Sequence, residues 1–336
     1  MTAVALVALR PFAARAGLLD IPGGRKTHTS PTPMIGGMGI YMGTLSICMH
    51  SPVIMNDYKI LLALSGFVLL VGVLDDLYDI RVSLRMAMHA TAAWVMAVTA
   101  NVQLTSLGEI TFNGPVELGL LAIPVTIFAT VGVINAINMS DGLDGLSGGL
   151  SVISLVLLSV AALSAGESAL LSFSQIVIVS LLTFLALNFR LLWKKSALVY
   201  LGDVGSTLLG FHIAWLLIAS TQGDKAFIAP VYALWFLAVP LMDTVSLMIR
   251  RPLRGSSPFK PGRDHLHHCL LNMGFDTRQT VLIIHVTALA MGGVGLAGHF
   301  AGAPQGLMLM LFITSFAIYL LASRHPLPED NRGLTR

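Results

Sequence analysis

Ten apolar stretches, each about as long as a bilayer is thick, constrain this chain more than any other feature. A helix needs roughly 20 apolar residues to cross the hydrocarbon core, and inside it the backbone must satisfy its own hydrogen bonds. The candidate spans are residues 34–55, 59–74, 86–104, 116–135, 146–164, 168–188, 205–221, 226–249, 279–299 and 304–323. Charged residues make up 11% of the chain and the mean hydropathy is +0.80, whereas soluble domains average about 25% charged residues. The sequence therefore predicts an all-α, polytopic integral membrane protein with about ten full transmembrane helices.

The N-terminal segment is apolar but short. Residues 1–9 cannot cross a bilayer at about 1.5 Å of rise per residue. We expect either the remnant of an eleventh helix that ends at Arg10 or a segment lying at the interface. A cleavable secretory signal is not expected, because no charged region precedes the apolar start.

Basic residues fix the predicted orientation. Alternating the ten spans places 18 of the 20 Lys and Arg residues on one side, with only Lys59 and Lys225 opposite. The positive-inside rule makes that side cytoplasmic. The same side collects the carboxylate-rich motifs, which predicts an active site facing the cytoplasm. Cys48 and Cys269 form no disulfide or metal pattern and are expected to be inert thiols.

A polar, glycine-rich turn between two apolar runs lies at the centre of the predicted site. Residues 135–149 contain Asp141 and Asp144, whose spacing would put both on one face of a helix. Asn135 and Asn138 precede them, and their amides can both donate and accept, which suits a nucleobase or sugar. Acids at the membrane edge, with glycines that admit a ligand to the backbone, predict a site for a metal and a phosphate. A polar helix end capped by glycines is the alternative.

Two further acidic motifs lie on the same predicted side. Asp75 and Asp76 end an apolar run, with Asp79 one turn on, and such a concentration of negative charge needs a cation or an arginine nearby. Solvated surface is the alternative. Asp203 precedes another apolar run, and we expect it to hold a metal while backbone N–H groups of Gly205 and Ser206 face a phosphate.

Basic residues in two loops suit a phosphorylated donor. Lys26 lies in a first polar loop rich in proline and glycine, which could equally be a basic loop that only obeys the topology rule. The longest cytoplasmic loop, 250–278, carries Arg251, Arg254, Arg263, His265, His267 and His268. Its alternatives are a zinc site, which lacks a completing ligand at suitable spacing, and a surface for anionic lipid. Asp243, inside the preceding span, is expected to have a partner, either an arginine or the substrate.

Four of these motifs together resemble the polyprenyl-phosphate N-acetylhexosamine-1-phosphate transferases, most closely the bacterial WecA-type branch. The matching segments run through nearly the whole chain: Asp75-Asp76, Asn138-Met-Ser-Asp-Gly-Leu-Asp144-Gly, Gly202-Asp-Val-Gly-Ser206 and Ser257-Pro-Phe to His265-Leu-His-His268. The resemblance implies one membrane domain over residues 1–336, with 250–278 as a donor-recognition loop. It also implies residence in the bacterial inner membrane.

The resemblance further implies the reaction and the roles of the residues. The expected reaction moves GlcNAc-1-phosphate from UDP-GlcNAc to undecaprenyl phosphate with release of UMP, a first step toward O antigen, common antigen or a related envelope polysaccharide. Mg²⁺ or Mn²⁺ would be held by Asp203 and Asp76. Catalytic roles fall to Asp75, Asp76, Asp144 and His265, and substrate contacts to Lys26, Asn135, Asn138, Asp141, Arg251, Arg254, Arg263, His267 and His268.

Other readings of the sequence stay open. A sibling enzyme could use another UDP-N-acetyl sugar, because a few residues around His265 would change the donor without altering the motifs. A transporter would instead spread its acids at the midplane of broken helices. The sequence does not decide between direct attack and a covalent aspartyl intermediate, although a phosphate dianion is already a competent nucleophile. No nucleic acid is expected as a partner, and a homodimer is compatible with the resemblance.

Overall fold

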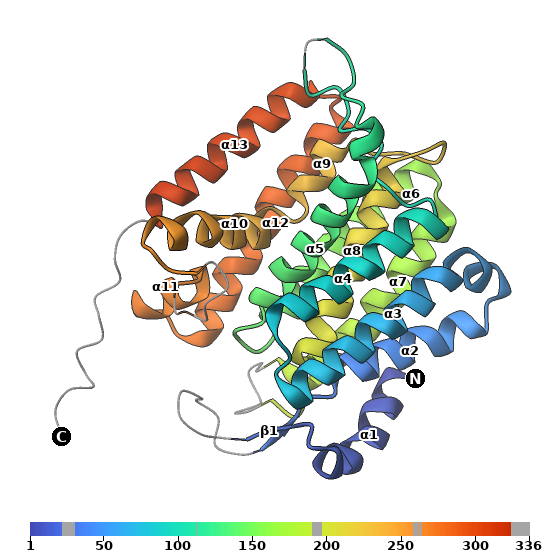
Figure 1. Cartoon of the computed structure of the whole chain (residues 1–336), viewed down its shortest axis with the longest axis vertical. Helices are drawn as coiled ribbons and strands as arrows, with labels where there is room; N and C mark the ends of the chain where they lie inside the picture. The colour runs from blue at the N-terminus through green and yellow to red at the C-terminus, as the bar shows by residue number, and fades with distance from the viewer. Residues whose placement is uncertain (22–30, 112, 190–196, 258–261, 263, 324–336) are drawn as a thin grey trace.

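The chain folds into a bundle of helices (Figure 1). The structure is a computed structural model, and it describes all residues except 22–30, 112, 190–196, 258–261, 263 and 324–336. The expected all-α class is confirmed for the described residues, apart from one antiparallel pair of two-residue strands, β1 (Leu19–Asp20) and β2 (Thr32–Pro33).

Seven helices are long and apolar enough to cross a membrane among the residues described. They are α3 (Pro52–Tyr78), α5 (Ala122–Met139, with the preceding 3₁₀ turn η1, Gly119–Leu121), α6 (Leu146–Ala165), α7 (Ser168–Asn188), α8 (Gly202–Thr221), α12 (Thr277–Phe300) and α13 (Gln305–Ala322). The prediction of a polytopic membrane protein is therefore confirmed in its coarse form.

The other three predicted spans are shorter or interrupted. Residues 34–55 contain α2 (Gly36–Met49), which has 14 residues, and residues 86–104 overlap α4 (Val82–Thr99), which has 18. The span expected over 226–249 is broken into α9 (Pro230–Trp235) and α10 (Ala238–Leu253).

The N-terminal helix is longer than the sequence suggested. Helix α1 (Thr2–Ala16) does not end at Arg10 but continues through Pro11. It ends where Gly17 adopts a left-handed conformation, with φ of 78°, which glycine adopts without steric cost.

Helix α8 is the centre of the core. In its most apolar stretch 94% of the residues are buried, and it packs against α2, α3, α5, α6 and α9. Glycines allow the closest approaches: a Cβ on Gly37 would lie 2.3 Å from the backbone of Gly205, and one on Gly72 would lie 2.5 Å from the Cα of Val204. These contacts fix the start of α8, which carries Asp203, against α2 and α3.

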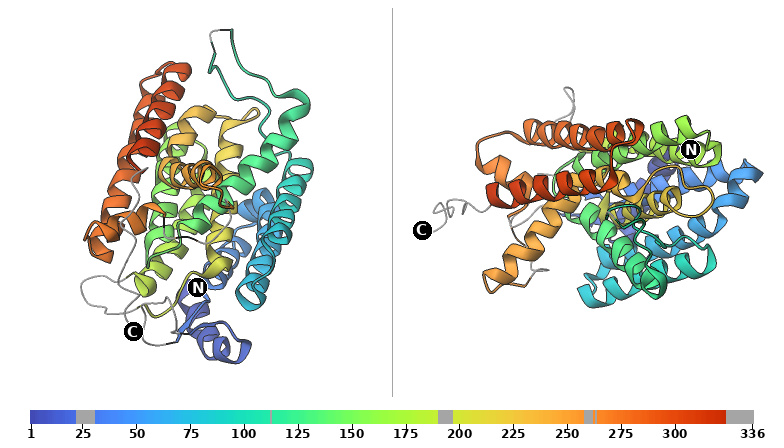
Figure 2. Two further views of the ribbon diagram at one scale, coloured as in Figure 1. Left: turned by 60° about the vertical axis from the view of Figure 1, so that its left-hand side comes forward. Right: turned by 90° about the horizontal axis from the view of Figure 1, so that it is seen from above.

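The C-terminal part forms one flank of the bundle (Figures 1 and 2). Helix α10 runs across the direction of α13, and the short α11 (Leu266–Asn272) leads into α12. Helix α13 is peripheral, with 6% of its most apolar stretch buried. The predicted loop 250–278 is thus partly helical, since it contains the end of α10, all of α11 and the start of α12.

Candidate active site

The acidic residues meet at one end of the bundle. Asp75 and Asp76 lie in the last turn of α3, Asp203 in the first turn of α8, and Asp141 and Asp144 in the turn between α5 and α6. This end carries β1 and lies at the bottom of Figure 1, whereas the long connection near residues 101–118 lies at the top. Distant segments therefore bring their acids to a single face of the bundle.

Asp141 and Asp144 do not lie on a helix, contrary to the helical spacing considered for them. Helix α5 ends at Met139 and α6 begins at Leu146. Gly145, with φ of 80°, reverses the chain, and its N–H donates to the Asn188 side chain over 2.7 Å. The glycines thus convert a potential helical turn into a tight connection.

Asp203 is the acid at the centre of the polar contacts. Its Oδ1 accepts a hydrogen bond of 2.7 Å from Nδ2 of Asn138, which also donates to Ser206 Oγ over 2.9 Å. Its Oδ2 lies 3.6 Å from the Arg85 guanidinium, and its side chain is 39% exposed. One oxygen is therefore held in place while the carboxylate remains accessible from solvent.

Asp76 caps α8 from a neighbouring helix. Its two carboxylate oxygens accept from the backbone N–H groups of Asp203, at 3.0 Å, and Val204, at 3.4 Å. The N-terminal N–H groups of a helix have no partner within it, so this carboxylate satisfies two of them. The expected phosphate cradle at Gly205 and Ser206 is wrong, because Gly205 packs on Gly37 and Ser206 is fully buried.

Arg85 is a site residue to which the sequence analysis gave no role. It lies in the first turn of α4 and forms an ion pair with the buried Asp75, besides its approach to Asp203. One guanidinium thus bridges two acids from different helices. The signal was present in the sequence as the second of two arginines directly after the acidic motif.

The acids at this end have unequal partners. Asp75 Oδ1 is buried and accepts no hydrogen bond from the described residues. Burial raises the pKa of Asp141 well above its ordinary value, and the charges of Asp203, Asp144 and Asp76 raise it further. Asp79 is exposed and caps α3 with φ of 47°. A cation at this face would relieve the repulsion among Asp141 and the acids that raise its pKa.

A divalent metal fits this donor set. Magnesium prefers oxygen ligands and is commonly held by one or two carboxylates together with substrate phosphates. Within the described residues no three His, Cys, Asp or Glu side chains converge as a complete metal site, so a zinc centre at the histidines has no geometric support. Asp203 offers an accessible carboxylate, and Asp76 binds the backbone at the same helix start, so these two acids supply the kind of oxygen ligand that magnesium uses.

The histidines lie beside the acidic turn. His265 is the N-cap of α11, its ring stacks on that of His267 at 5.5 Å, and His267 in turn contacts His268 at 4.2 Å. A Cβ on Gly142 would lie 2.3 Å from His267 Nε2, so His267 packs directly on the turn that carries Asp141. Burial, aided by the two neighbouring histidines, lowers the pKa of His267 to about 3, so its imidazole is neutral near pH 7.

The arginines of this segment divide into two kinds. Arg251 is buried and binds Asp264 with two nitrogens, at 3.1 and 2.6 Å. Burial alone would raise the pKa of Asp264, but the pairing with Arg251 lowers it below its ordinary value. Arg254 is exposed at the end of α10. Arg263 and Lys26 lie outside the described residues.

Asn135 uses its side chain in contacts between helices. Its amide donates to the carbonyl of Val131 at 2.7 Å and to the sulfur of Met86 at 3.1 Å. The side chain is buried between α4 and α5, and this arrangement makes it part of the helix packing.

Asp243 was expected to have a partner, and the structure shows two side-chain partners. It pairs with His265 and with Tyr319 of α13. Cys48 is buried, and both it and Cys269 are free thiols.

Comparisons with known proteins show the family of this chain. Residues 58–221 match glycosyl transferase family 4. The chain is 37% identical to undecaprenyl-phosphate alpha-N-acetylglucosaminyl 1-phosphate transferases of Salmonella typhi and Escherichia coli K12, with 95% of this chain and 87% of each relative covered. It is also 37% identical to the protein of that name from Haemophilus influenzae, over 95% of this chain and 90% of the relative. The chain therefore belongs to glycosyl transferase family 4, the polyprenyl-phosphate N-acetylhexosamine-1-phosphate transferases that its motifs resemble.

Proposed function

We propose that this protein transfers GlcNAc-1-phosphate from UDP-GlcNAc to undecaprenyl phosphate, releasing UMP and forming undecaprenyl-diphospho-GlcNAc. The observation that carries the proposal is the convergence of Asp75, Asp76, Asp141 and Asp203 at one end of a membrane bundle, next to His267. The relatives that share 37% identity over nearly the whole chain carry this activity in their name.

The proposed reaction is a direct displacement at phosphorus. An oxygen of the lipid phosphate forms a bond to the β-phosphorus of UDP-GlcNAc, and the bond from that phosphorus to the bridging oxygen breaks, so UMP leaves with the electron pair. UDP-GlcNAc and the fully ionised lipid phosphate each carry two negative charges, and so do the two products. The charge therefore balances without removal of a proton from the acceptor. Such chemistry depends mainly on positioning and charge.

The residues of the site would have different roles in this reaction. A divalent cation, Mg²⁺ or Mn²⁺, when bound by Asp203 and Asp76, would neutralise charge on the diphosphate. Arg85 holds Asp75 and approaches Asp203, so Asp75 is set to orient the acceptor phosphate or to accept a proton if that phosphate arrives protonated. Asn138 fixes the Asp203 carboxylate. Asp141, Asp144 and the histidines would face the donor.

We further propose the inner-membrane topology that the basic residues favour. The acidic end would face the cytoplasm, where nucleotide sugars are made, and the connection near 101–118 would face the opposite side. Helices α1, α2, α4, α9 and α10 would complete the embedded bundle, bringing the spans toward ten. The downstream product would be O antigen, common antigen or a related envelope polysaccharide, and a homodimer is the proposed assembly.

The wild-type enzyme gives the first test. Purified membranes supplied with undecaprenyl phosphate, Mg²⁺ and a panel of UDP-sugars are expected to release UMP with UDP-GlcNAc. EDTA should stop the release, and added Mg²⁺ or Mn²⁺ should restore it. Release with a different UDP-N-acetyl sugar would replace the donor in the proposal, and metal-independent release would remove the cation.

Arg85→Lys tests whether one side chain must serve both acids. A lysine ammonium keeps the charge but lacks the forked guanidinium, so it can reach Asp75 or Asp203 but not both. We expect UMP release to fall by about tenfold, in the range seen for residues that orient ligands. Arg81→Lys, at the exposed start of α4, is the matched control and should match the wild type. Equal activities for all three proteins would rule out a bridging role.

A further inference from the structure

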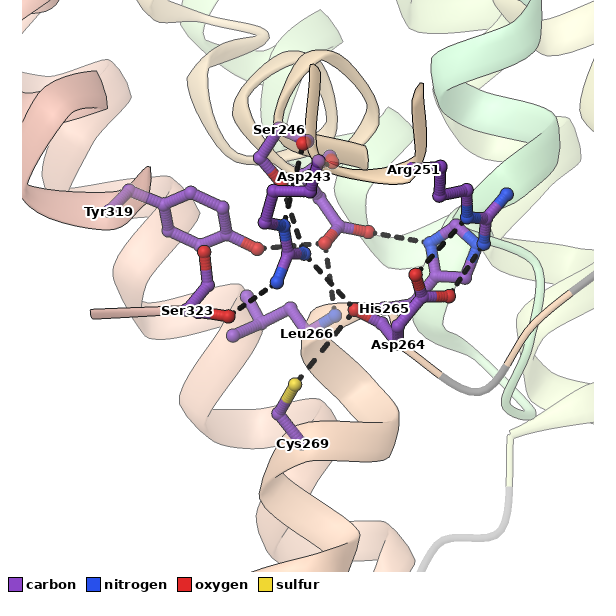
Figure 3. A network of polar contacts seen from close by, with 10 residues as sticks. Asp243, Ser246, Arg251, Asp264, His265, Leu266, Cys269, Tyr319 and Ser323 are labelled. Carbon is purple, nitrogen blue, oxygen red and sulfur yellow. Dashed lines mark hydrogen bonds and ion pairs between the residues drawn. The ribbon is translucent and has the colours of Figure 1, made fainter. Parts of the chain in front are cut away.

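A buried carboxylate lies behind the histidine segment, away from the acidic cluster. Asp243 of α10 is 5% exposed. Its Oδ2 lies 2.8 Å from His265 Nδ1, and its Oδ1 accepts from the Leu266 N–H at 3.0 Å and from the Tyr319 hydroxyl at 2.7 Å (Figure 3). The acid thus joins three helices, α10, α11 and α13.

The partners of Asp243 define its charge and the tautomer of His265. A backbone N–H can only donate, and Tyr319 donates its hydroxyl proton. The two donors on Oδ1 stabilise the ionised form, and an imidazole is a stronger base than a carboxylate, so we assign Asp243 as a carboxylate, which can only accept from the imidazole. His265 must therefore carry a proton on Nδ1, which leaves Nε2 for a group on the other side of the ring.

The His265 ring is connected to the acidic turn through its neighbour. Its plane lies 14° from that of His267, with the centroids 5.5 Å apart. His267 packs against Gly142 so closely that a Cβ there would lie 2.3 Å from Nε2. His265 thus lies one ring away from the turn that holds Asp141.

The surrounding contacts make this arrangement rigid. Arg250 binds the carbonyls of Ser323 and, at 3.3 Å, Asp264, and Arg251 forms its two-nitrogen pair with the Asp264 side chain. Figure 3 shows Arg251 and Asp264 beside His265, at the start of α11. The residue directly before His265 is thus fixed from two sides.

We propose that Asp243 is a positioning residue for the transfer reaction, which acts by holding His265 in the Nδ1-protonated tautomer and in the orientation that presents Nε2 to the sugar-nucleotide donor. Tyr319 supports it by holding the second carboxylate oxygen. The proposal rests on the proposed function, because His265 matters only if the donor binds beside it. It assigns to α10 and α13 a role in the reaction that no motif in them suggests.

Asp243→Asn is the main variant. The amide keeps the shape of the side chain, and its oxygen can still accept from Leu266 and Tyr319, but its NH₂ group now faces His265 Nδ1. A donor at that position favours the opposite tautomer. We expect kcat for UMP release from UDP-GlcNAc to fall about 10- to 100-fold, as for other residues that orient a ligating or catalytic histidine, with KM for undecaprenyl phosphate unchanged.

A double-mutant cycle separates positioning from general support of the fold. If Asp243 acts through His265, then Asp243→Asn in a His265→Gln background should cost less than a further twofold. If the two losses multiply, or if Asp243→Asn alone matches the wild type, the proposal is overturned. Full activity of His265→Gln would overturn it as well, while leaving the transferase reaction intact.

Tyr319→Phe provides a second route to the same test. It removes one hydrogen bond from Asp243 and leaves the contact with His265, so we expect a fall of about threefold in the wild-type background and none in His265→Gln. If Asp243→Asn is not recovered as a folded protein, Tyr319→Phe in the wild-type and His265→Gln backgrounds replaces it as the test. A threefold fall in both backgrounds would then contradict the proposal. Absence of UMP release by the wild type with any UDP-sugar would overturn the proposed function itself, and this inference with it.

Discussion

Asp203→Asn should abolish UMP release, with a loss of at least about 10³-fold, while leaving the protein as stable as the wild type or more so. The activity should fall because Asp203 is the accessible carboxylate of the proposed cation site, and electrostatic groups of this kind contribute on the order of 10²–10³-fold each, with the metal adding to that. The fold should survive because the asparagine oxygen can still accept from Asn138 at the position of Oδ1.

We expect Asp203→Asn to lose activity without losing stability, and the reason is the repulsion among the acids. The charge of Asp203 helps to raise the pKa of Asp141, so the acids repel one another in the metal-free protein. Removing one charge reduces that repulsion, and the pKa of Asp141 should fall toward its ordinary value. We therefore expect an equal or higher thermal unfolding temperature in metal-free buffer, and weaker stabilisation by added Mg²⁺ than in the wild type.

The matched control for this variant is Asp79→Asn. Asp79 lies one helical turn from Asp75 but is exposed and has a left-handed backbone conformation, with φ of 47°, which asparagine adopts readily. The UMP release of Asp79→Asn should equal that of the wild type. A large loss in Asp79→Asn, or wild-type activity in Asp203→Asn, would contradict the assignment of the cation site to the start of α8.

The sequence predicted this face of the molecule well because its chemistry is local to short motifs. Acids at the ends of apolar runs must emerge at the membrane surface, and the basic residues placed all of these ends on one side. The seven long helices follow from length and composition alone. The alternation of spans then predicted which motifs would meet, although it could not predict their contacts.

What the sequence missed depends on side-chain partners and on chain geometry. The hydropathy pattern did not show the break between α9 and α10, because the apolar run continues through it, although Pro240 lies in the first turn of α10, where a proline is tolerated. The sequence did not show that Asp76 also caps α8. The partner of Asp243 comes from a segment 22 residues away, and its other partner, Tyr319, lies in the last helix. Such pairings require the packing of α10, α11 and α13, which hydropathy does not encode.

Two glycines form a helix contact that the motifs in the sequence did not predict. Gly205 was expected to face a phosphate, but together with Gly37 it forms the contact between α2 and α8. The first amides of α2 are satisfied by backbone carbonyls beside that contact: Gly36 N–H donates to Tyr200 at 2.9 Å and Gly37 N–H to Leu201 at 3.1 Å. The backbones approach so closely only because neither glycine has a side chain.

Gly37→Ala is expected to be strongly destabilising. Its Cβ would lie 2.3, 2.4 and 2.7 Å from backbone atoms of Gly205 and Val204, and backbone cannot rotate away as a flexible side chain can. Overpacking of a core commonly costs about 1–3 kcal/mol, occasionally more, and we expect a value near 3 kcal/mol here. The unfolding temperature should fall by about 5–10 °C, as followed by tryptophan fluorescence in detergent.

Gly132→Ala is the control that makes this result specific. Gly132 lies inside α5, and a Cβ there would meet nothing within 4 Å, so alanine should stabilise the helix by about 0.5–1 kcal/mol. The two identical substitutions should therefore shift stability in opposite directions. Because α8 begins three residues before Gly205, Gly37→Ala should also displace Asp203, and displacements of about 1 Å can cost 10²-fold in rate. An alanine at position 37 that left both stability and UMP release unchanged would mean that α2 and α8 are not in the contact described, and the placement of Asp203 against α3 would fail with it.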